Sequence, residues 1–334
     1  MVTRNRDEQL ILLLGDIHAN EVAFMATLED ARRRYPGRRL PIWFLGDLFG
    51  RGPRPTATWR RFVQNKPEAV VIGNHEGGLI DVYTNITSGD SSTGQYNPPD
   101  WEVLLRHRED LHSVDLLTCE GGHVVGGAVF DTVSHWPVVF MPRPSIYMVH
   151  GGLERAFEPG PDLQHRLVWE YVKNSAQADH TLEAMNWLAA NPPDDPAFQL
   201  WPDGPAKPEL VLVGHWHTRL FYDQTSGEWQ NPVQLDTPYS LDGQITLLSP
   251  GSVGFPRQNG ELNASYCVLT LRNNRPFQAV FHTSAYDRES VRNEMVRQGY
   301  PTKTVGRLRL PGETETARPG VRVAYQGCVP EDES

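Results

Sequence analysis

Residues Ile11 to His18 read ILLLGDIH, a short apolar run that ends in glycine, aspartate and histidine. Four later stretches repeat this arrangement, an apolar run followed by side chains that can bind metal: PIWFLGD (Pro41 to Asp47), AVVIGNHE (Ala69 to Glu76), SIYMVHG (Ser145 to Gly151) and LVLVGHWH (Leu210 to His217). Runs that are apolar at every position, rather than at every second one, are typical of strands covered on both faces. The sequence therefore predicts five buried strands.

The segments between the first three runs predict helices. EVAFMATLEDARRRY, from Glu21 to Tyr35, has the apolar spacing of an amphipathic helix, and PTATWRRFVQN fits a short helix that Thr56 or Thr58 could cap. Alternating strands and helices predict right-handed crossovers and a largely parallel sheet, hence an α/β protein. In such sheets ligands bind beyond the carboxyl ends of the strands, where every candidate metal ligand falls.

The fifth run ends in two histidines, His215 and His217, separated by one tryptophan. In an extended chain, positions i and i+2 point to the same side, so both imidazoles could reach one common point, such as a metal ion. The alternative is a pair of exposed histidines in a turn, an ordinary place for this residue.

The candidate ligands offer carboxylate, amide and imidazole groups without a thiolate: Asp16, His18, Asp47, Asn74, His150, His215 and His217. Such a set suits manganese, iron(II), zinc or nickel. It is too large for one ion, so we expect two that share a carboxylate. One ion would bind Asp16, His18 and His217; the other would bind Asn74, His150 and His215; Asp47 would bridge them. Taken singly, the aspartates and Asn74 would also fit helix N-caps.

Two cations held ~3.5–4 Å apart can bind a hydroxide between them and hold the oxygens of a phosphoryl group that it attacks in line. The reaction also needs an acid that protonates the leaving group. His75 follows a predicted ligand without being one itself, and we expect it to be that acid.

The motifs GDIH, GD at Gly46 and Asp47, GNHE, HGG and GHWH, in this order, resemble those of the calcineurin-like metallophosphoesterase superfamily. The resemblance covers roughly residues 9 to 285. It implies an αββα sandwich of two mixed sheets packed face to face, with helices outside and the metal site at the carboxyl ends of the strands. It also implies hydrolysis of phosphomonoesters or phosphodiesters, the ligand set above and His75 as the catalytic histidine. The expected cofactors are two divalent ions, foremost Mn²⁺, with Fe²⁺, Zn²⁺ and Ni²⁺ as alternatives.

Two further segments narrow the resemblance. SPGSVGFPRQNGELNASYCVL, from Ser249 to Leu269, is similar to a segment of small bacterial and archaeal phosphodiesterase-like members, although Ser249 replaces their usual asparagine. GDLFGRG is also similar to phosphoprotein phosphatases, whose phosphate-binding arginine matches Arg51. Their aspartate that orients the catalytic histidine is Gly50 here, which argues against a close copy of their mechanism. Arg51 and Arg257 are therefore candidate phosphate contacts, and each also fits a solvated loop charge.

Composition and charge exclude some classes of partner and site. A net charge of −10 argues against a protein that coats duplex nucleic acid or an anionic membrane. Three scattered cysteines without a C-x-x-C pair indicate a reducing compartment. No segment approaches the ~18 apolar residues of a membrane span, so we expect a cytoplasmic protein.

We expect one domain over residues 1–310, with inserted loops around 77–145 and 153–208 and a poorly ordered tail at 311–334. Gly77 to Asp100 is rich in turn-forming residues and predicts a long loop, whereas Tyr286 to Tyr300 predicts a helix that begins near Asp287.

The sequence thus predicts a dinuclear-metal phosphodiesterase that uses a metal-bridging hydroxide on a small substrate, a cyclic or short nucleotide phosphodiester. The alternatives are a phosphomonoesterase similar to serine/threonine protein phosphatases and, from another class, a non-catalytic binding or scaffold protein. The oligomeric state is not readable from the sequence.

Overall fold

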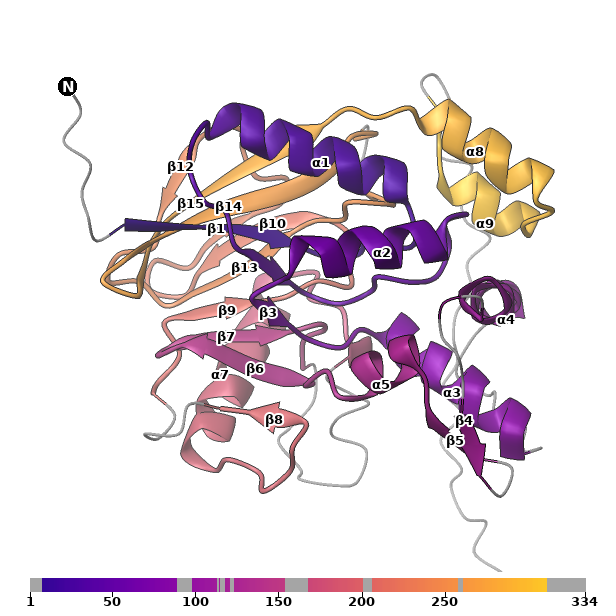
Figure 1. Ribbon diagram of the computed structural model, residues 1–334. Helices are drawn as coiled ribbons and strands as arrows, with labels where there is room; N and C mark the ends of the chain where they lie inside the picture. The colour runs from indigo at the N-terminus through magenta and orange to yellow at the C-terminus, as the bar shows by residue number, and fades with distance from the viewer. Residues whose placement is uncertain are drawn as a thin grey trace, which may run out of the picture.

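Two β-sheets form the centre of the protein in a computed structural model, which describes residues 8–88, 98–112, 114, 118–120, 123–153, 168–200, 206–257 and 261–310 (Figure 1). The six-stranded sheet has the order β12 (Pro238–Ser240), β15 (Arg275–Ser284), β14 (Ala264–Arg272), β1 (Glu8–Leu14), β2 (Ile42–Phe44) and β3 (Ala69–Val70). The seven-stranded sheet has the order β11 (Glu228–Gln230), β10 (Arg219–Asp223), β13 (Thr246–Pro250), β9 (Leu210–Leu212), β7 (Ile146–Val149), β6 (Val139–Arg143) and β8 (Phe198–Gln199).

Both sheets are mixed. In the first, β1, β2 and β3 run parallel, as the strand–helix alternation predicted, and β14 pairs antiparallel with β1. In the second, β7, β9 and β13 run parallel, while β10 and β6 add antiparallel partners. A separate two-stranded ribbon joins β4 (Thr118–Glu120) and β5 (His123–Gly126).

The apolar strands bury both of their faces, which explains why no alternation is visible in their sequences. In β1, Ile11 and Leu13 belong to the core shared by the two sheets, whereas Leu12 and Leu14 belong to the core under the helices. In the second sheet, Leu212 likewise enters the core between the sheets. The predicted αββα sandwich is confirmed.

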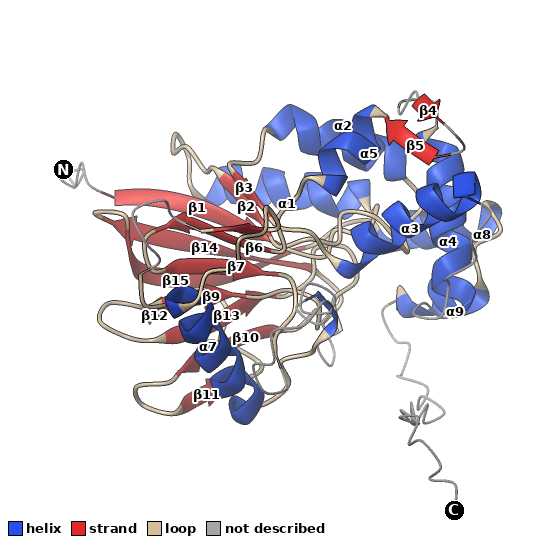
Figure 2. Ribbon diagram, turned by 90° about the horizontal axis from the view of Figure 1, so that it is seen from below, coloured by secondary structure: helices blue, strands red, loops and turns tan. Residues whose placement is uncertain are grey.

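The helices lie outside the sheets and at one end of them (Figures 1 and 2). Their bounds are α1 (Glu21–Arg34), α2 (Pro55–Asn65), α3 (Asn74–Ser88), α4 (Pro98–Leu111), α5 (Ala128–Ser134), α7 (Ser175–Ala190), α8 (Arg288–Arg297) and α9 (Thr302–Arg307). Helices α1 and α2 cover the six-stranded sheet, and α7 covers the seven-stranded sheet. Helices α3, α4, α8 and α9 gather at the end towards which β1 runs.

The structure tests the predicted starts of two helices. The helix predicted near Asp287 is confirmed, because the Asp287 side chain accepts a hydrogen bond from the Ser290 N–H at the start of α8. The threonine cap of α2 was wrong: Arg54 is the N-cap residue, and the helix begins at Pro55 without a side-chain cap. Proline suits this first position because its missing N–H would have no partner there.

The long loop predicted from Gly77 was also wrong, because residues 77–88 belong to α3. Leu79, Val82 and Tyr83 of this helix are buried in the core that also contains α1 and α2 residues, and this packing outweighs the poor helix propensity of its two glycines. Residues 89–97 and the predicted disordered tail at 311–334 lie outside the described residues. The expected single domain over 1–310 stays a prediction. No helix in the described ranges is long and apolar enough to cross a membrane.

Candidate metal centre

The predicted ligands converge from both sheets. Asp16 follows β1, Asp47 follows β2 and Asn74 begins α3 just after β3, whereas His150 follows β7 and His215 lies shortly after β9. All of these side chains are buried. The carboxyl ends of strands from two different sheets therefore deliver polar groups to one position inside the protein.

Two overlapping groups of ligand atoms lie within this cluster. The first contains Asp16, His18, Asp47 and His217, and the second contains Asp47, His150 and His215; within each, the ligand atoms lie within 4.8 Å of one another. Asp47 is common to both, and its Oδ2 lies 3.6 Å from His18 Nε2 and 3.4 Å from His150 Nε2. Asn74 joins the second group, with its Oδ1 3.1 Å from His150 Nε2.

The structure corrects the geometry expected for His215 and His217. Both residues have positive φ, 64° and 63°, so the chain turns here instead of running extended. The two imidazoles enter different groups, His217 the first and His215 the second, which is how the sequence-based assignment had divided them. Asp16, His18 and Asp47 also have φ between 52° and 61°. Non-glycine residues in this conformation are uncommon and cluster at functional sites, where surrounding contacts hold them.

Backbone carbonyls fix which nitrogen of each imidazole faces the cluster. The Nδ1–H of His18 donates to Phe49 O at 2.9 Å, and the Nδ1–H of His217 donates to Phe255 O at 2.6 Å. A carbonyl only accepts, so in both neutral rings Nε2 carries a lone pair. His215 is reversed: its Nε2–H donates to Trp169 O at 2.9 Å, leaving Nδ1 for the cluster.

These tautomers bring electron-pair acceptors face to face. His18 Nε2 lies 2.9 Å from His217 Nε2, which in turn lies 3.2 Å from Asp16 Oδ1. Three acceptors at such distances repel one another unless a cation lies between them. Among the described residues, neither Asp16 oxygen nor Asp47 Oδ2 has a hydrogen-bond partner, although all three atoms are buried. Buried polar atoms without partners are costly, and divalent cations at these positions would satisfy them.

Protonation also fits a metal centre. Burial lowers the pKa values of His18, His215 and His217 well below the usual range, so these rings are neutral and able to coordinate. Burial raises the pKa of Asp16 to about 7. His150 differs: burial lowers its pKa, but the Asp47 carboxylate has the opposite effect, and together with its other partners it brings the pKa to about 9. The Asp47 carboxylate thus favours a positive charge beside it, which a metal cation would supply.

Comparison with known proteins agrees with this geometry. A family model described as calcineurin-like phosphoesterase matches residues 10–219. The chain belongs to this family. A metallophosphoesterase from Sphaerobacter thermophilus has the same fold, with a TM-score of 0.60 and 24% identity over 90% of this chain and 98% of that one. A hypothetical protein from Pyrococcus horikoshii superposes with a TM-score of 0.57 and 15% identity, covering 91% of this chain and 99% of that chain.

Curated relatives match a shorter part of this calcineurin-like phosphoesterase. A symmetrical bis(5'-nucleosyl)-tetraphosphatase from Burkholderia thailandensis is 38% identical over 108 residues, which are 30% of this chain and 37% of that protein. The same enzyme from Psychromonas ingrahamii is 33% identical over 98 residues, covering 28% of this chain and 34% of the relative. The match thus spans about a third of the length of these relatives.

His75, the predicted acid, lies beside the first group. Its backbone N–H donates to Asp47 Oδ1 at 2.9 Å, and its ring meets the His18 ring edge-on, with centroids 4.7 Å apart. Neither ring nitrogen has a hydrogen-bond partner among the described residues. Burial lowers the His75 pKa to about 4, so the free imidazole is neutral near pH 7.

Gly50 makes the room that the His75 ring fills. A Cβ atom on Gly50 would lie 2.0 Å from His75 Nδ1, and the glycine has φ +80°. In phosphoprotein phosphatases the matching position bears an aspartate, as the sequence comparison of GDLFGRG indicated. Here the imidazole itself occupies the space that a side chain on residue 50 would need, so this calcineurin-like phosphoesterase orients its histidine differently.

Arg51 and Arg257, the candidate phosphate contacts, both lie near His217. Arg51 is buried, with φ 65°, and its Nη1 lies 3.3 Å from His217 Nε2. The backbone N–H of Arg257 donates to His217 O at 3.1 Å. Burial, with the nearby Arg257 charge, lowers the pKa of Arg51 to about 9. After burial, the charges of Arg257 and Arg51 are the next causes that lower the pKa of His217, so both guanidinium groups lie close to the candidate metal centre.

Sequence reasoning missed Glu76, although it stands in the quoted GNHE motif. Its buried carboxylate accepts backbone N–H bonds from Asp47 at 2.7 Å, Leu48 at 2.8 Å, Phe49 at 3.1 Å and Gly73 at 2.9 Å. These bonds tie the loop after β2 to the loop after β3. Glu76 therefore holds Asp47 in place and belongs to neither ligand group.

His107 in α4 is a second residue whose part the sequence did not reveal. Its Nδ1 accepts a hydrogen bond from Gly50 N at 3.1 Å, and its Nε2–H donates to Gly52 O at 2.8 Å. Tyr300, which follows α8, also donates to Gly52 O, at 3.0 Å. The helices at the end of the sheets thus fix both sides of Arg51.

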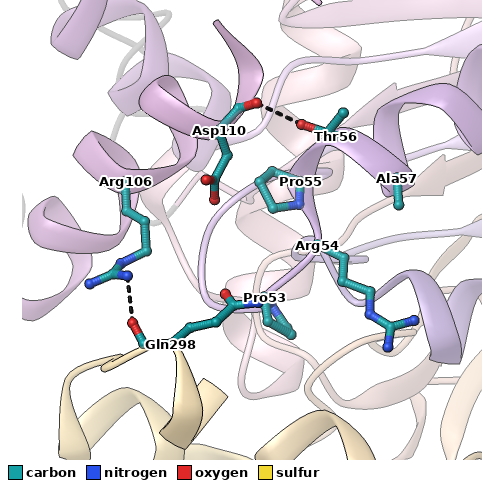
Figure 3. A pocket seen from close by; sticks show the side chains of 8 residues that line it. All are labelled: Pro53, Arg54, Pro55, Thr56, Ala57, Arg106, Asp110 and Gln298. Carbon is teal, nitrogen blue, oxygen red and sulfur yellow. Dashed lines mark hydrogen bonds between the residues drawn. The ribbon is translucent and has the colours of Figure 1, made fainter. Parts of the chain in front are cut away.

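A surface pocket of 440 Å³ lies next to this loop but is separate from the metal centre (Figure 3). Its walls are the start of α2 and residues of α4 and the end of α8: Pro53, Arg54, Pro55, Thr56, Ala57, Arg106, Asp110 and Gln298. Arg54 is paired with Glu21 and Glu294. None of the predicted site residues lines this pocket.

Proposed function

We propose that this protein is a dinuclear-metal phosphodiesterase that hydrolyses cyclic or short nucleotide phosphodiesters. The observation that carries the proposal is the pair of ligand groups sharing Asp47, in which acceptor atoms face each other at 2.9–3.6 Å. Membership in the calcineurin-like phosphoesterase family supports hydrolysis of a phosphoester. The curated relatives, which are named as nucleosyl tetraphosphatases, favour a nucleotide as the substrate.

We assign one cation to Asp16, His18 and His217, the other to Asn74, His150 and His215, and the bridge to Asp47. The oxygen and nitrogen ligands suit Mn²⁺ first, with Fe²⁺, Zn²⁺ and Ni²⁺ as alternatives. Two such cations would lower the pKa of a water molecule and neutralise charge on the phosphate oxygens.

The chain's own residues bind the substrate and move the proton. Arg51 and Arg257 bind phosphate oxygens, for which the guanidinium fork is well suited. The His75 imidazole, whose nitrogens are free of protein partners among the described residues, donates a proton to the leaving oxygen. The imidazole must be protonated to act as this acid, and the negative charge of a bound phosphate favours its protonated form.

The test is turnover by the Mn²⁺-loaded protein of bis-p-nitrophenyl phosphate, p-nitrophenyl phosphate, a cyclic nucleotide and a dinucleoside polyphosphate. We expect the diester to be hydrolysed faster than the monoester. A faster monoesterase reaction would favour the protein-phosphatase-like alternative. No turnover of any of these compounds at full metal loading would favour a binding or scaffold protein.

A further inference from the structure

Residues Ser252 to Arg257, which we call the Ser252 segment, lie against the loops that carry the first group of ligands. The segment follows β13, and all of its residues except Arg257 are buried. A Cβ atom on Gly254 would lie 2.1 Å from Ile17 O, so a glycine is needed for the segment to approach the loop after β1 this closely. Apart from Arg257, the proposed function assigns no role to these residues.

The Ser252 hydroxyl connects two ligands of the first group. Its Oγ–H donates to Asp16 O at 2.8 Å, and the same oxygen accepts the Phe255 N–H at 2.8 Å. Phe255 O in turn accepts the hydrogen bond of His217 Nδ1, and the Phe255 ring meets the His18 ring edge-on, with centroids 5.8 Å apart. Since a hydroxyl donates and accepts at once, this one group links the backbone of Asp16 to the imidazole of His217.

The Ser252 segment also holds the left-handed backbone of these two ligands. Asp16 has φ 53° and His217 has φ 63°. Asp16 O accepts a further hydrogen bond from Gly254 N at 3.0 Å, and His217 O accepts one from Arg257 N at 3.1 Å. Non-glycine residues keep such a conformation only where surrounding contacts impose it. The segment supplies these contacts at both ligands.

Histidines of the second group are held by other parts of the chain. The Nδ1–H of His150 donates to Leu45 O at 2.6 Å, and the Nε2–H of His215 donates to Trp169 O at 2.9 Å. Among the described residues, no hydrogen bond joins the Ser252 segment to His150 or His215. A change in the segment should therefore act on one metal position and spare the other.

We propose that Ser252 is a positioning residue for the first metal ion alone, because its hydroxyl fixes Asp16 and His217 together. This proposal rests on the metal assignment of the proposed function and adds that the two ions depend on different segments. Groups that orient metal ligands typically contribute about 10- to 100-fold in metal affinity. Ser252→Ala should weaken the first ion by such a factor and leave the second ion bound.

The test measures metal binding at each position. Metal-free protein is titrated with Mn²⁺, bound ions are counted by elemental analysis, and anomalous scattering from Mn²⁺-soaked crystals shows which position is depleted. We expect wild type to bind both ions and Ser252→Ala to keep the ion at His150 and His215, with the Kd of the other raised at least tenfold. Ser249→Ala is the matched control, because this nearby buried serine accepts the Gly251 N–H at 3.3 Å within its own turn; it should keep both ions.

Tyr286→Phe perturbs the same segment from outside. The Tyr286 hydroxyl donates to Gly254 O at 3.1 Å, so its loss should weaken the first ion at least threefold. This variant decides the question if thermal unfolding of the metal-free protein shows that Ser252→Ala does not fold. Unchanged Kd values for both ions, or equal loss of both ions from a folded variant, overturn the proposal. The proposed function fails in a different way, when the wild type binds no stoichiometric Mn²⁺ or, once loaded, hydrolyses none of the substrates named above.

Discussion

Replacing Gly50 by alanine should remove catalysis while leaving the metal centre loaded. The added Cβ would lie 2.0 Å from His75 Nδ1, and side-chain carbons essentially never approach other heavy atoms closer than 3.0 Å. The ring must therefore move by about 1 Å. A misplacement of this size can reduce turnover roughly 100-fold. Since no predicted ligand lies among the three atoms nearest to this Cβ, we expect kcat to fall about 100-fold with unchanged metal stoichiometry.

Gly37→Ala is the matched control. Gly37 also has a positive φ, +68°, but no atom lies within 4 Å of the position that its added Cβ would take. Both variants bear the same backbone cost of the left-handed conformation, ~1–2 kcal/mol. Thermal unfolding should show this cost in each, whereas only Gly50→Ala should lose turnover. If Gly50→Ala retains kcat within threefold of Gly37→Ala, the placement of His75 against Gly50 is not what catalysis depends on.

Three further outcomes follow from the buried contacts. Asp47→Asn should lose bound metal and activity together, as measured by elemental analysis and diester turnover; full metal content would contradict its bridging position. Glu76→Gln replaces one acceptor oxygen by an N–H₂ group and so breaks two of the four hydrogen bonds to backbone N–H groups. The free energy of unfolding, measured by chemical unfolding, should fall by roughly 3 kcal/mol. The control Glu289→Gln, at an exposed position, should leave it almost unchanged. His107 has its pKa lowered to about 3, chiefly by burial. As the pH decreases below the unfolded-state pKa of about 6.5, the unfolded chain takes up this proton before the folded protein does, so the free energy of unfolding decreases by up to ~1.4 kcal/mol per pH unit. His107→Gln should flatten this slope in unfolding measurements at several pH values. An unchanged slope would show that other groups cause it.

The strands and the candidate ligands could be predicted because both depend on short, continuous stretches of the sequence. Ile11 to Leu14 are apolar at every position, which is the pattern of a strand between two layers, and Asp16 follows directly. The start of α8 was predictable for the same reason, since Asp287 caps it through its own side chain. Helix α3 was not, because Gly77 and the polar residues around it favour a turn, and distant packing partners decide the outcome.

The sequence alone indicated that seven side chains able to bind metal follow buried strands, and that His75 stands among them. The sequence also assigned His215 and His217 to different ions, but only the tertiary structure decided that the backbone at both residues is left-handed instead of extended. It also decided which atoms face the centre of the cluster, since carbonyls from remote segments, such as Phe255 O, select the ring nitrogen that donates. These hydrogen bonds join atoms that are many residues apart in the chain, and no local pattern of apolar and polar residues predicts them.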